Sequence, residues 1–284
     1  MRHRFLVSLC LVSSVALAAC DKNVNADAEV ERAVKDLNVI DETNLNDIML
    51  TVADPDESIQ YFKKATLADP DRLDLQRGLA MSYIRAKKPR EGVTAWQKVV
   101  AHPDSTSNDK VELAGAQIRN SDWKGAEATL NSVPPTVETY TRYRLEAMVA
   151  DSKQQWKKAD SFYETALGLT TTPAGVLNNW GYSKLTRGDF VGAEKLFADA
   201  IGYDPKLFTA KNNLVLARGA QRKYDLPILN VTQDEQAELL YTLALSAIKQ
   251  GDVKTGQGLL KEAIEVHPQH FEAASRALKA LETG

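Results

Sequence analysis

The amino-acid sequence predicts an all-α protein built from helix pairs that repeat along one chain. Residue types recur at a fixed interval, since the pair Asn178-Asn179 is followed 34 residues later by Asn212-Asn213. Apolar residues within the repeated stretches are spaced three and four apart, as on one face of a helix, and proline or glycine separates the stretches. A repeat of this length is typical of solenoids, in which each unit buries its apolar face against its neighbours.

The clearest unit runs from Gly181 through Ala193, Phe197 and Ala200 to Pro205. Its order of small, small, large and small residues before a proline is the signature of the tetratricopeptide repeat, a helix-turn-helix unit of about 34 residues. Two antiparallel helices approach closely only where both carry small residues, so Gly181 is expected to lie opposite Ala193. We therefore predict a right-handed tetratricopeptide-repeat solenoid over residues 39–284.

The same frame fits five more units, and the first of these shows only its second helix clearly. Each has a large residue at the position of Phe197, with a small residue four positions earlier: Phe62, Trp96, Leu130, Tyr163 and Leu260. Gly188 and Asp189 are expected to make the turn between the two helices of their unit. A single helix from about residue 270 to residue 281 is expected to cap the array, because the ends of repeat arrays need a polar outer face.

One unit, near residues 208–236, is incomplete. Its first helix is followed by the proline-containing stretch 224–230 in place of a second helix, and Thr232 and Glu235 then have the spacing of a capping box for the next helix. We expect this stretch to fill the place of the missing helix by packing three apolar side chains against the stack, those of Leu226, Ile228 and Leu229. A docking strand for a partner protein is the alternative interpretation.

Residues 1–19 have the form of a secretion signal, because Arg2 and Arg4 precede an apolar run that is too short to span a bilayer. The run ends in Leu17-Ala18-Ala19-Cys20, which resembles the lipobox of bacterial lipoproteins. That resemblance implies cleavage before Cys20 and lipidation of this residue, and several acyl chains hold a protein durably at a membrane. Residues 20–38 are then the lipidated N-terminus and a tether. Ordinary secretion, with a cysteine at this position by chance, is the alternative.

The composition excludes several classes of function. Cys10 is expected to leave with the signal, so Cys20 would be the only cysteine of the mature chain, and no disulfide within one molecule and no metal-binding thiol pair is expected. The formal net charge of −3, without a basic run, argues against a nucleic-acid partner. His267 and His270 flank a proline at a helix end, with no further ligands nearby, so no metal site is expected. No nucleophile elbow or phosphate loop is recognisable, and we expect no catalytic residues, no cofactor and no small-molecule substrate.

The first helices of a repeat array line a concave groove, and the residues one turn from their buried face point into it. By the frame, the groove residues are Arg77, Met81, Arg85, Arg119, Arg144, Met148, Asp151, Asn178, Tyr182, Asn212, Leu216, Tyr241, Leu245 and Lys249. Asparagine can hydrogen-bond the backbone of an extended peptide, and arginine can hold a carboxylate at two points. The groove is therefore predicted to bind a protein partner. The alternative is that its polar residues only keep the helices solvated.

Three stretches of the C-terminal part carry a family resemblance: LNNWGYSKLTRGDFVGAEKLFADAIGYDP from residue 177, KNNLVLARGAQRKYDLPI from residue 211 and ELLYTLALSAIKQGD from residue 238. They resemble the lipid-anchored TadD proteins of the Tad (tight adherence, or Flp) pilus-assembly systems. The resemblance implies a scaffolding or pilotin-like role for an outer-membrane secretin or other pilus parts, in the cell envelope facing the periplasm. It favours the outer membrane, whereas Asp21 after the lipidated cysteine leaves the inner membrane open. Repeat lipoproteins that serve cell-wall hydrolases or outer-membrane protein assembly are the competing class.

Overall fold

The structure is a computed structural model that describes residues 42–283. The predicted signal peptide, Cys20 and the tether lie outside the described residues. Within the described range the chain forms fourteen α-helices and no strand. They are α2 (Glu42–Thr51), α3 (Pro55–Ala68), α4 (Leu73–Arg85), α5 (Pro89–Ala101), α6 (Ser107–Arg119), α7 (Trp123–Asn131), α8 (Tyr140–Ser152), α9 (Trp156–Gly168), α10 (Ala174–Thr186), α11 (Phe190–Tyr203), α12 (Phe208–Ala220), α13 (Gln233–Lys249), α14 (Val253–Val266) and α15 (Glu272–Thr283).

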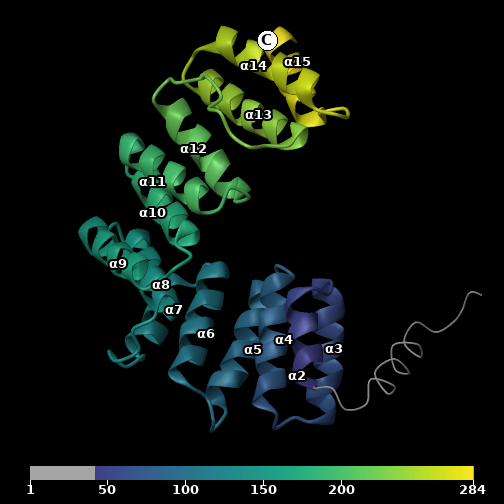
Figure 1. Ribbon diagram of the computed structural model, residues 1–284, viewed down its shortest axis with the longest axis vertical. Helices are drawn as coiled ribbons and strands as arrows, with labels where there is room; N and C mark the ends of the chain where they lie inside the picture. The colour runs from purple at the N-terminus through teal and green to yellow at the C-terminus, as the bar shows by residue number, and fades with distance from the viewer. Residues whose placement is uncertain (1–41, 284) are drawn as a thin grey trace, which may run out of the picture.

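Consecutive helices pack as pairs, and the pairs follow one another along an arc from α2 and α3 to the C-terminal helices (Figure 1). The first helices of the units are α2, α4, α6, α8, α10, α12 and α13, and each except α12 is followed by a second helix. The predicted all-α solenoid is confirmed. The structure adds α2, which the sequence frame did not show, because the stretch ETNLNDIMLT has few apolar residues and no small–large spacing.

Each first helix from α4 to α13 ends in the same left-handed turn. The residue with positive φ (56–85°) recurs in six units, at Lys87, Ser121, Gln154, Gly188, Arg222 and Gly251. The next residue donates its backbone N–H to the carbonyl five positions earlier, with N···O distances of 2.8–3.0 Å, which is a Schellman closure. The predicted turn at Gly188 is confirmed. Four of the six positions are not glycine, although a left-handed residue with a Cβ costs about 1–2 kcal/mol, so helix packing imposes this turn.

The missing second helix after α12 has a local cause at Pro227. In the other five units the second helix begins with the same backbone hydrogen bond. Its donor is the residue five positions after the left-handed one, and its acceptor is the carbonyl four positions before that donor. These donors are the small residues Gly92, Ala126, Ala159, Ala193 and Gly256. Pro227 occupies the matching position after Arg222 and has no N–H to donate. Proline also disfavours the helical conformation at the residue before it, so α12 is left without a partner helix.

The stretch 224–230 packs against the helices in place of the missing one, and its side chains join the apolar clusters on both sides of α12. Leu226 and Leu229 contact the apolar core of the C-terminal units, as predicted. The prediction for Ile228 was wrong, since this side chain is fully exposed. Leu226 and Leu229 are three residues apart and both face the helices, and the backbone between them turns Ile228 to solvent. The end of the stretch is held by the buried Lys211, whose Nζ donates a hydrogen bond of 2.7 Å to the carbonyl oxygen of Asn230.

Small residues set the distance between the two helices within a unit. A Cβ built on Gly181 would lie 2.7 Å from Cε1 of Phe197, so the phenyl ring covers this glycine. In the last complete unit a Cβ on Gly256 would lie 3.2 Å from the carbonyl oxygen of Ala244. There the two backbones do approach each other at the small residues of the frame.

Candidate peptide-binding groove

The first helices from α4 to α13 present three rows of residues at matching positions. The first row is Arg77, Val111, Arg144, Asn178, Asn212 and Tyr241; the middle row is Met81, Gly115, Met148, Tyr182, Leu216 and Leu245; the third row is Arg85, Arg119, Ser152, Thr186, Ala220 and Lys249. Thirteen of the fourteen predicted groove residues lie in these rows, and Asp151 lies beside them. The middle row carries only apolar residues and one glycine.

At the C-terminal end the three rows form the wall of an open groove. It has a volume of about 720 Å³ and is lined by residues of α10, the start of α11, α12 and α13. Leu216, Tyr241 and Leu245 supply apolar surface, and Asn212 and Lys249 supply polar groups beside them. Clefts of this size, mostly apolar with a few polar groups, are typical of ligand-binding sites. The Tyr241 ring is held in place by Phe271, at a centroid distance of 5.4 Å.

The asparagines of the first row join neighbouring units through their oxygens. Asn213 Nδ2 donates to Asn178 Oδ1 over 3.0 Å, and Thr242 Oγ1 donates to Asn212 Oδ1 over 2.8 Å. The amide nitrogens of Asn178 and Asn212 have no hydrogen-bond partner among the described residues. Both side chains are half-buried, so these donors are fixed in orientation and open to a carbonyl group from outside.

Two of the predicted arginines use their guanidinium groups within the chain. Arg77 makes two hydrogen bonds of 2.7 Å to the carboxylate of Asp109, in the next unit. Arg85 donates over 2.9 Å to the carbonyl oxygens of Met49 and Ala53, at the N-terminal end of the array. These two arginines lie on the predicted face, and their polar atoms fasten α4 to neighbouring elements.

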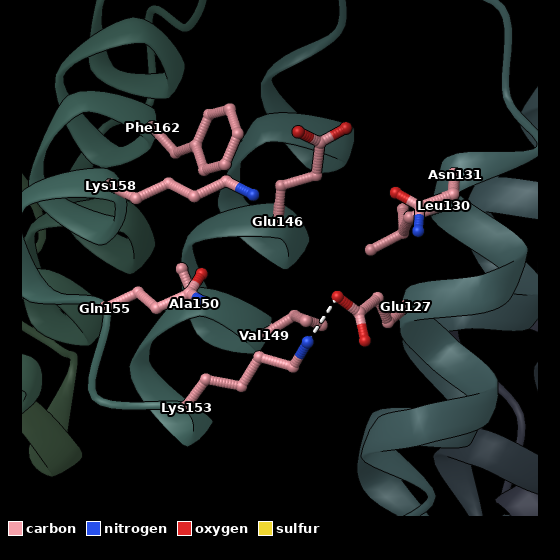
Figure 2. Close-up of a pocket in the computed structure, with 10 residues that line it drawn as sticks. All are labelled: Glu127, Leu130, Asn131, Glu146, Val149, Ala150, Lys153, Gln155, Lys158 and Phe162. Carbon is pink, nitrogen blue, oxygen red and sulfur yellow. Dashed lines mark hydrogen bonds and ion pairs between the residues drawn. The ribbon is translucent and has the colours of Figure 1, made fainter.

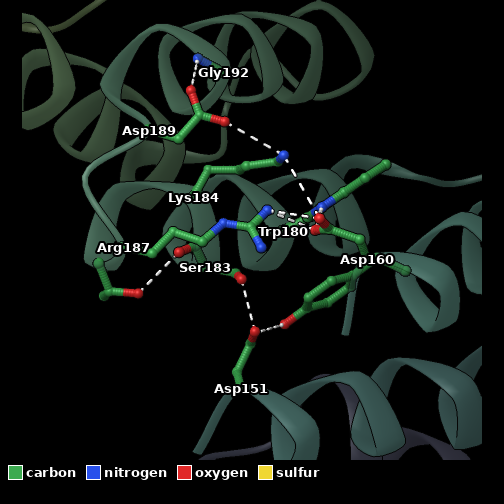
Figure 3. A network of polar contacts seen from close by, with 10 residues as sticks. Asp151, Asp160, Trp180, Ser183, Lys184, Arg187, Asp189 and Gly192 are labelled. Carbon is green, nitrogen blue, oxygen red and sulfur yellow. Dashed lines mark hydrogen bonds and ion pairs between the residues drawn. The ribbon is translucent and has the colours of Figure 1, made fainter. Parts of the chain in front are cut away.

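Asp151 belongs to a network between α8, α9 and α10 (Figure 3). It accepts hydrogen bonds from Ser183 Oγ over 2.7 Å and from Tyr163 Oη over 2.9 Å. Burial raises the pKa of its carboxyl, against the effect of these two donors. Burial and the neighbouring Asp151 also raise the pKa of the Tyr163 hydroxyl, so it remains a donor. Asp151 thus links units and is not a free groove carboxylate.

A second carboxylate of this network fixes Trp180. The indole Nε1 donates to Asp160 Oδ1 over 2.6 Å, and Arg187 Nη2 lies 2.7 Å from the same oxygen. Burial raises the pKa of Asp160, but hydrogen bonds from Arg187 and Trp180 outweigh it, so the pKa lies below its ordinary value. The repeat frame did not predict an acidic partner for Trp180, because 20 residues separate the two and neither fits a local motif.

A crevice on the second-helix side, between α7, α8 and α9, is much smaller (Figure 2). Its volume is about 30 Å³, which is about the space of one water molecule. Lys153 Nζ reaches across it to Glu127 Oε1, as the dashed line in Figure 2 shows. A polar crevice of this size, closed by an ion pair, does not compete with the groove as a site for a partner.

The described residues contain no cluster of three or more potential metal ligands. Among the same residues, no helix is both long and apolar enough to cross a bilayer.

The comparisons with known proteins agree with this architecture. Residues 238–270 match a family model described as tetratricopeptide repeat. The APC/C hetero-tetramer Cut9-Hcn1 superposes with a TM-score of 0.61 at 13% identity, covering 89% of this chain and 51% of that one. A tetratricopeptide repeat protein from Parabacteroides merdae gives a TM-score of 0.56 at 13% identity, covering 84% and 96%. The chain folds as a tetratricopeptide-repeat solenoid.

Two further proteins are similar to this chain, one in structure and one in sequence. PilW, a widely conserved type IV pilus biogenesis factor, gives a TM-score of 0.54 at 15% identity, covering 72% of this chain and 98% of its own. The BBSome complex member BBS4 of Bos taurus is 24% identical over 84% of this chain, which spans about half of that relative's length. Tetratricopeptide-repeat arrays generally scaffold protein interactions through such extended concave surfaces.

Proposed function

We propose that this protein is a lipid-anchored, non-enzymatic scaffold of the bacterial cell envelope that binds an extended segment of a protein partner along its groove. The observation that carries the proposal is the apolar middle row beside fixed amide donors. Tyr182 and Leu245 are 53% and 43% exposed, although both are large and uncharged. Exposed apolar surface bordered by polar groups is typical of interaction sites.

The groove fits an extended peptide through two kinds of contact. Apolar side chains of the partner bury against Leu216, Tyr241 and Leu245, and each buried large side chain contributes roughly 1.5–3 kcal/mol. Backbone carbonyls of the partner accept from the open amide nitrogens of Asn178 and Asn212, which lie one repeat apart on neighbouring first helices. Because Asn213 and Thr242 hold these two amides in place, little ordering entropy is lost on binding.

A pair of variants with matched exposure tests the groove. Leu245→Asp places a charge in the groove, whereas Val253→Asp places one on α14, at a side chain with nearly the same exposure (43% and 41%). A photo-crosslinking residue at Leu216 captures the partner in cells, and the yield is compared between the two backgrounds. We expect Leu245→Asp to abolish the crosslink and Val253→Asp to preserve it, with unchanged circular dichroism for both. Equal yields would sink the groove proposal.

We further propose that the partner is a component of a Tad/Flp pilus-assembly system, with the secretin as the leading candidate. The resemblance of the segment from Leu177 to the C-terminus to TadD proteins supports this, and PilW is an example of the same fold in a pilus biogenesis factor. Mass spectrometry of the captured product from Leu216 identifies the partner. Recovery of cell-wall hydrolases or outer-membrane assembly proteins, without pilus components, would overturn the assignment.

The membrane anchor is part of the proposal and has its own test. If Cys20 is lipidated, Cys20→Ala abolishes incorporation of labelled palmitate, and persistent labelling would refute the lipobox interpretation. Fractionation of membranes from the wild type and from Asp21→Ser then decides the location. We expect the wild type in the outer membrane, and its exclusive recovery with the inner membrane would contradict a pilotin role.

A further inference from the structure

The segment 228–232, just after Pro227, has the side-chain pattern of a strand that lacks a partner. Ile228, Asn230 and Thr232 are exposed, whereas Leu229 and Val231 are half-buried and pack against the apolar core of the C-terminal units. Thr232 has extended backbone angles, with φ −74° and ψ 168°. Strict alternation with one apolar face is typical of a half-buried strand. Within residues 42–283 there is no strand for the segment to pair with.

The backbone of this segment is almost unpaired. The N–H groups of residues 228–231 have no acceptor among the described residues. Of the carbonyl oxygens of residues 228–231, that of Asn230 alone has a donor within the described part of the chain, and this donor is Lys211 Nζ. In a paired strand the N–H and C=O of one residue point to the same edge, and those of the next residue point to the other edge. The edge of Asn230 is therefore held against α12, and the backbone groups of Leu229 and Val231 form an open edge.

Contacts at its end and on its inner face hold the segment in place. The N–H of Thr232 donates to Glu235 Oε2 over 3.2 Å, in the capping box of α13, and Lys211 Nζ lies 3.1 Å from the same carboxylate oxygen. Ordering before binding lowers the entropy cost of docking. Natural edge strands are commonly blocked by charged side chains. The three exposed side chains of this segment are uncharged, and that of Ile228 is fully exposed, so nothing blocks the open edge in this way.

We propose that the segment 228–232 is a docking strand, to which an extended segment of another protein adds by backbone hydrogen bonds to Leu229 and Val231. An extended polypeptide carries donors and acceptors at the same period of two, which is the basis of strand addition. An apolar side chain of the added segment packs beside Ile228, as cross-strand neighbours do. No residue of the docking strand lines the open groove, so this site goes beyond the proposed function.

A second copy of this chain does not suit the open edge in an antiparallel pair. Both copies would then have their helices on the same side of the two strands, which lie only about 4.7–4.9 Å apart. Helices are about 10–12 Å across with their side chains, so the two solenoids would overlap. An extended segment of another protein brings no such bulk to the edge.

Three labelled octapeptides test the docking strand with the purified full-length lipoprotein in detergent. Threonine and valine alternate in all three. The first peptide is unmodified, the second is N-methylated at every valine and the third at every threonine, so each modified peptide lacks the N–H donors of one edge. Hydrogen exchange measures protection of the protein, and fluorescence anisotropy measures affinity. We expect the unmodified peptide to slow exchange at Leu229 and Val231, and one methylated peptide to bind about tenfold or more weakly.

Substitutions assign the binding to this edge. Ile228→Lys should weaken binding of the unmodified peptide about tenfold or more, because a charge replaces the apolar neighbour of the added strand. Val191→Lys on α11, at another exposed apolar side chain, is the matched control and should bind like the wild type. Leu245→Asp should leave the protection unchanged, so the docking strand and the groove fail separately.

Two results would overturn the docking strand: no slowing of exchange in residues 228–232 at the highest soluble peptide concentration, or equal affinity for the three peptides. A dimer of the lipoprotein alone that Ile228→Lys dissociates would overturn the choice of partner, in favour of a second copy of this chain.

Discussion

Adding one methyl group at Gly256 and one at Gly258 should change stability in opposite directions, although both glycines lie in α14. A Cβ at Gly258 meets nothing within 4 Å. A Cβ at Gly256 would lie 2.4 Å from Ile248 Cγ1 and 3.2 Å from the carbonyl oxygen of Ala244. The side chain of Ile248 can change rotamer, but the backbone oxygen cannot move unless α13 and α14 separate.

The magnitude follows from two opposing effects. Replacing glycine by alanine inside a helix stabilises it by roughly 0.5–1 kcal/mol, and this gain applies at both sites. Overpacking in a close interface costs roughly 1–3 kcal/mol, and it applies only at Gly256. The common gain cancels in the comparison, so Gly256→Ala should be less stable than Gly258→Ala by about 1–3 kcal/mol. In a chain of this size each kcal/mol corresponds to a Tm shift of about 2–4 °C.

Thermal unfolding followed by circular dichroism compares the two variants with the wild type. Because a repeat array can lose units separately, hydrogen exchange of α13 and α14 supplies a local measurement. We expect faster exchange in both helices for Gly256→Ala and slower exchange for Gly258→Ala. Equal stability of Gly256→Ala and Gly258→Ala would contradict this reasoning. The close approach of α13 and α14 would then not explain the glycine at position 256.

Two further predictions concern charged residues that join units. Lys211→Met should lower the free energy of unfolding by about 1–3 kcal/mol and speed hydrogen exchange in residues 224–231, because the carbonyl of Asn230 loses its buried donor. The control Lys206→Met, at an exposed residue, should change both quantities little. Asp109→Asn should lower the free energy of unfolding by about 1–2 kcal/mol at pH 7. Urea unfolding should show a smaller difference between variant and wild type below about pH 4. Burial raises the pKa of Asp109, but hydrogen bonds from Arg77 and from the helix cap outweigh it, so the folded pKa is lowered. The stability that the carboxylate contributes is therefore present above its unfolded pKa, about 3.9, and is lost as the pH falls through the lower folded value. A pH-independent difference would contradict this explanation.

The repeat frame made most of the fold predictable, because helix approach depends on residue size at fixed spacings. It located the turn at Gly188 and the capping box at Thr232, and both are confirmed. It missed α2, whose helix depends on packing against α3 and α4 and not on its own pattern. It misplaced Ile228, since a frame based on helical periodicity says nothing about side-chain directions in an extended stretch.

The candidate site was less predictable than the fold. The frame placed the groove residues on the first helices, but it could not show which polar groups are already used. Arg77 finds its acceptor 32 residues away, and Asn178 is bonded to a residue 35 positions later. Such contacts depend on rotamers and on the offset between units, neither of which is encoded in local spacing.

The absence of a partner helix beside α12 has a consequence for how the array responds to stress. In a chain of units that couple only to their neighbours, cooperativity is limited by the weakest interface. At the other junctions the second helix of a unit packs against the first helix of the next unit, but between α12 and α13 the stretch 224–230 takes the place of that second helix. Pro227 therefore makes the coupling of the last units to the rest depend in part on an extended stretch, which Leu226, Leu229 and the contact with Lys211 hold in place. The open groove spans this junction, so a partner bound across α12 and α13 would add a further connection between the two units.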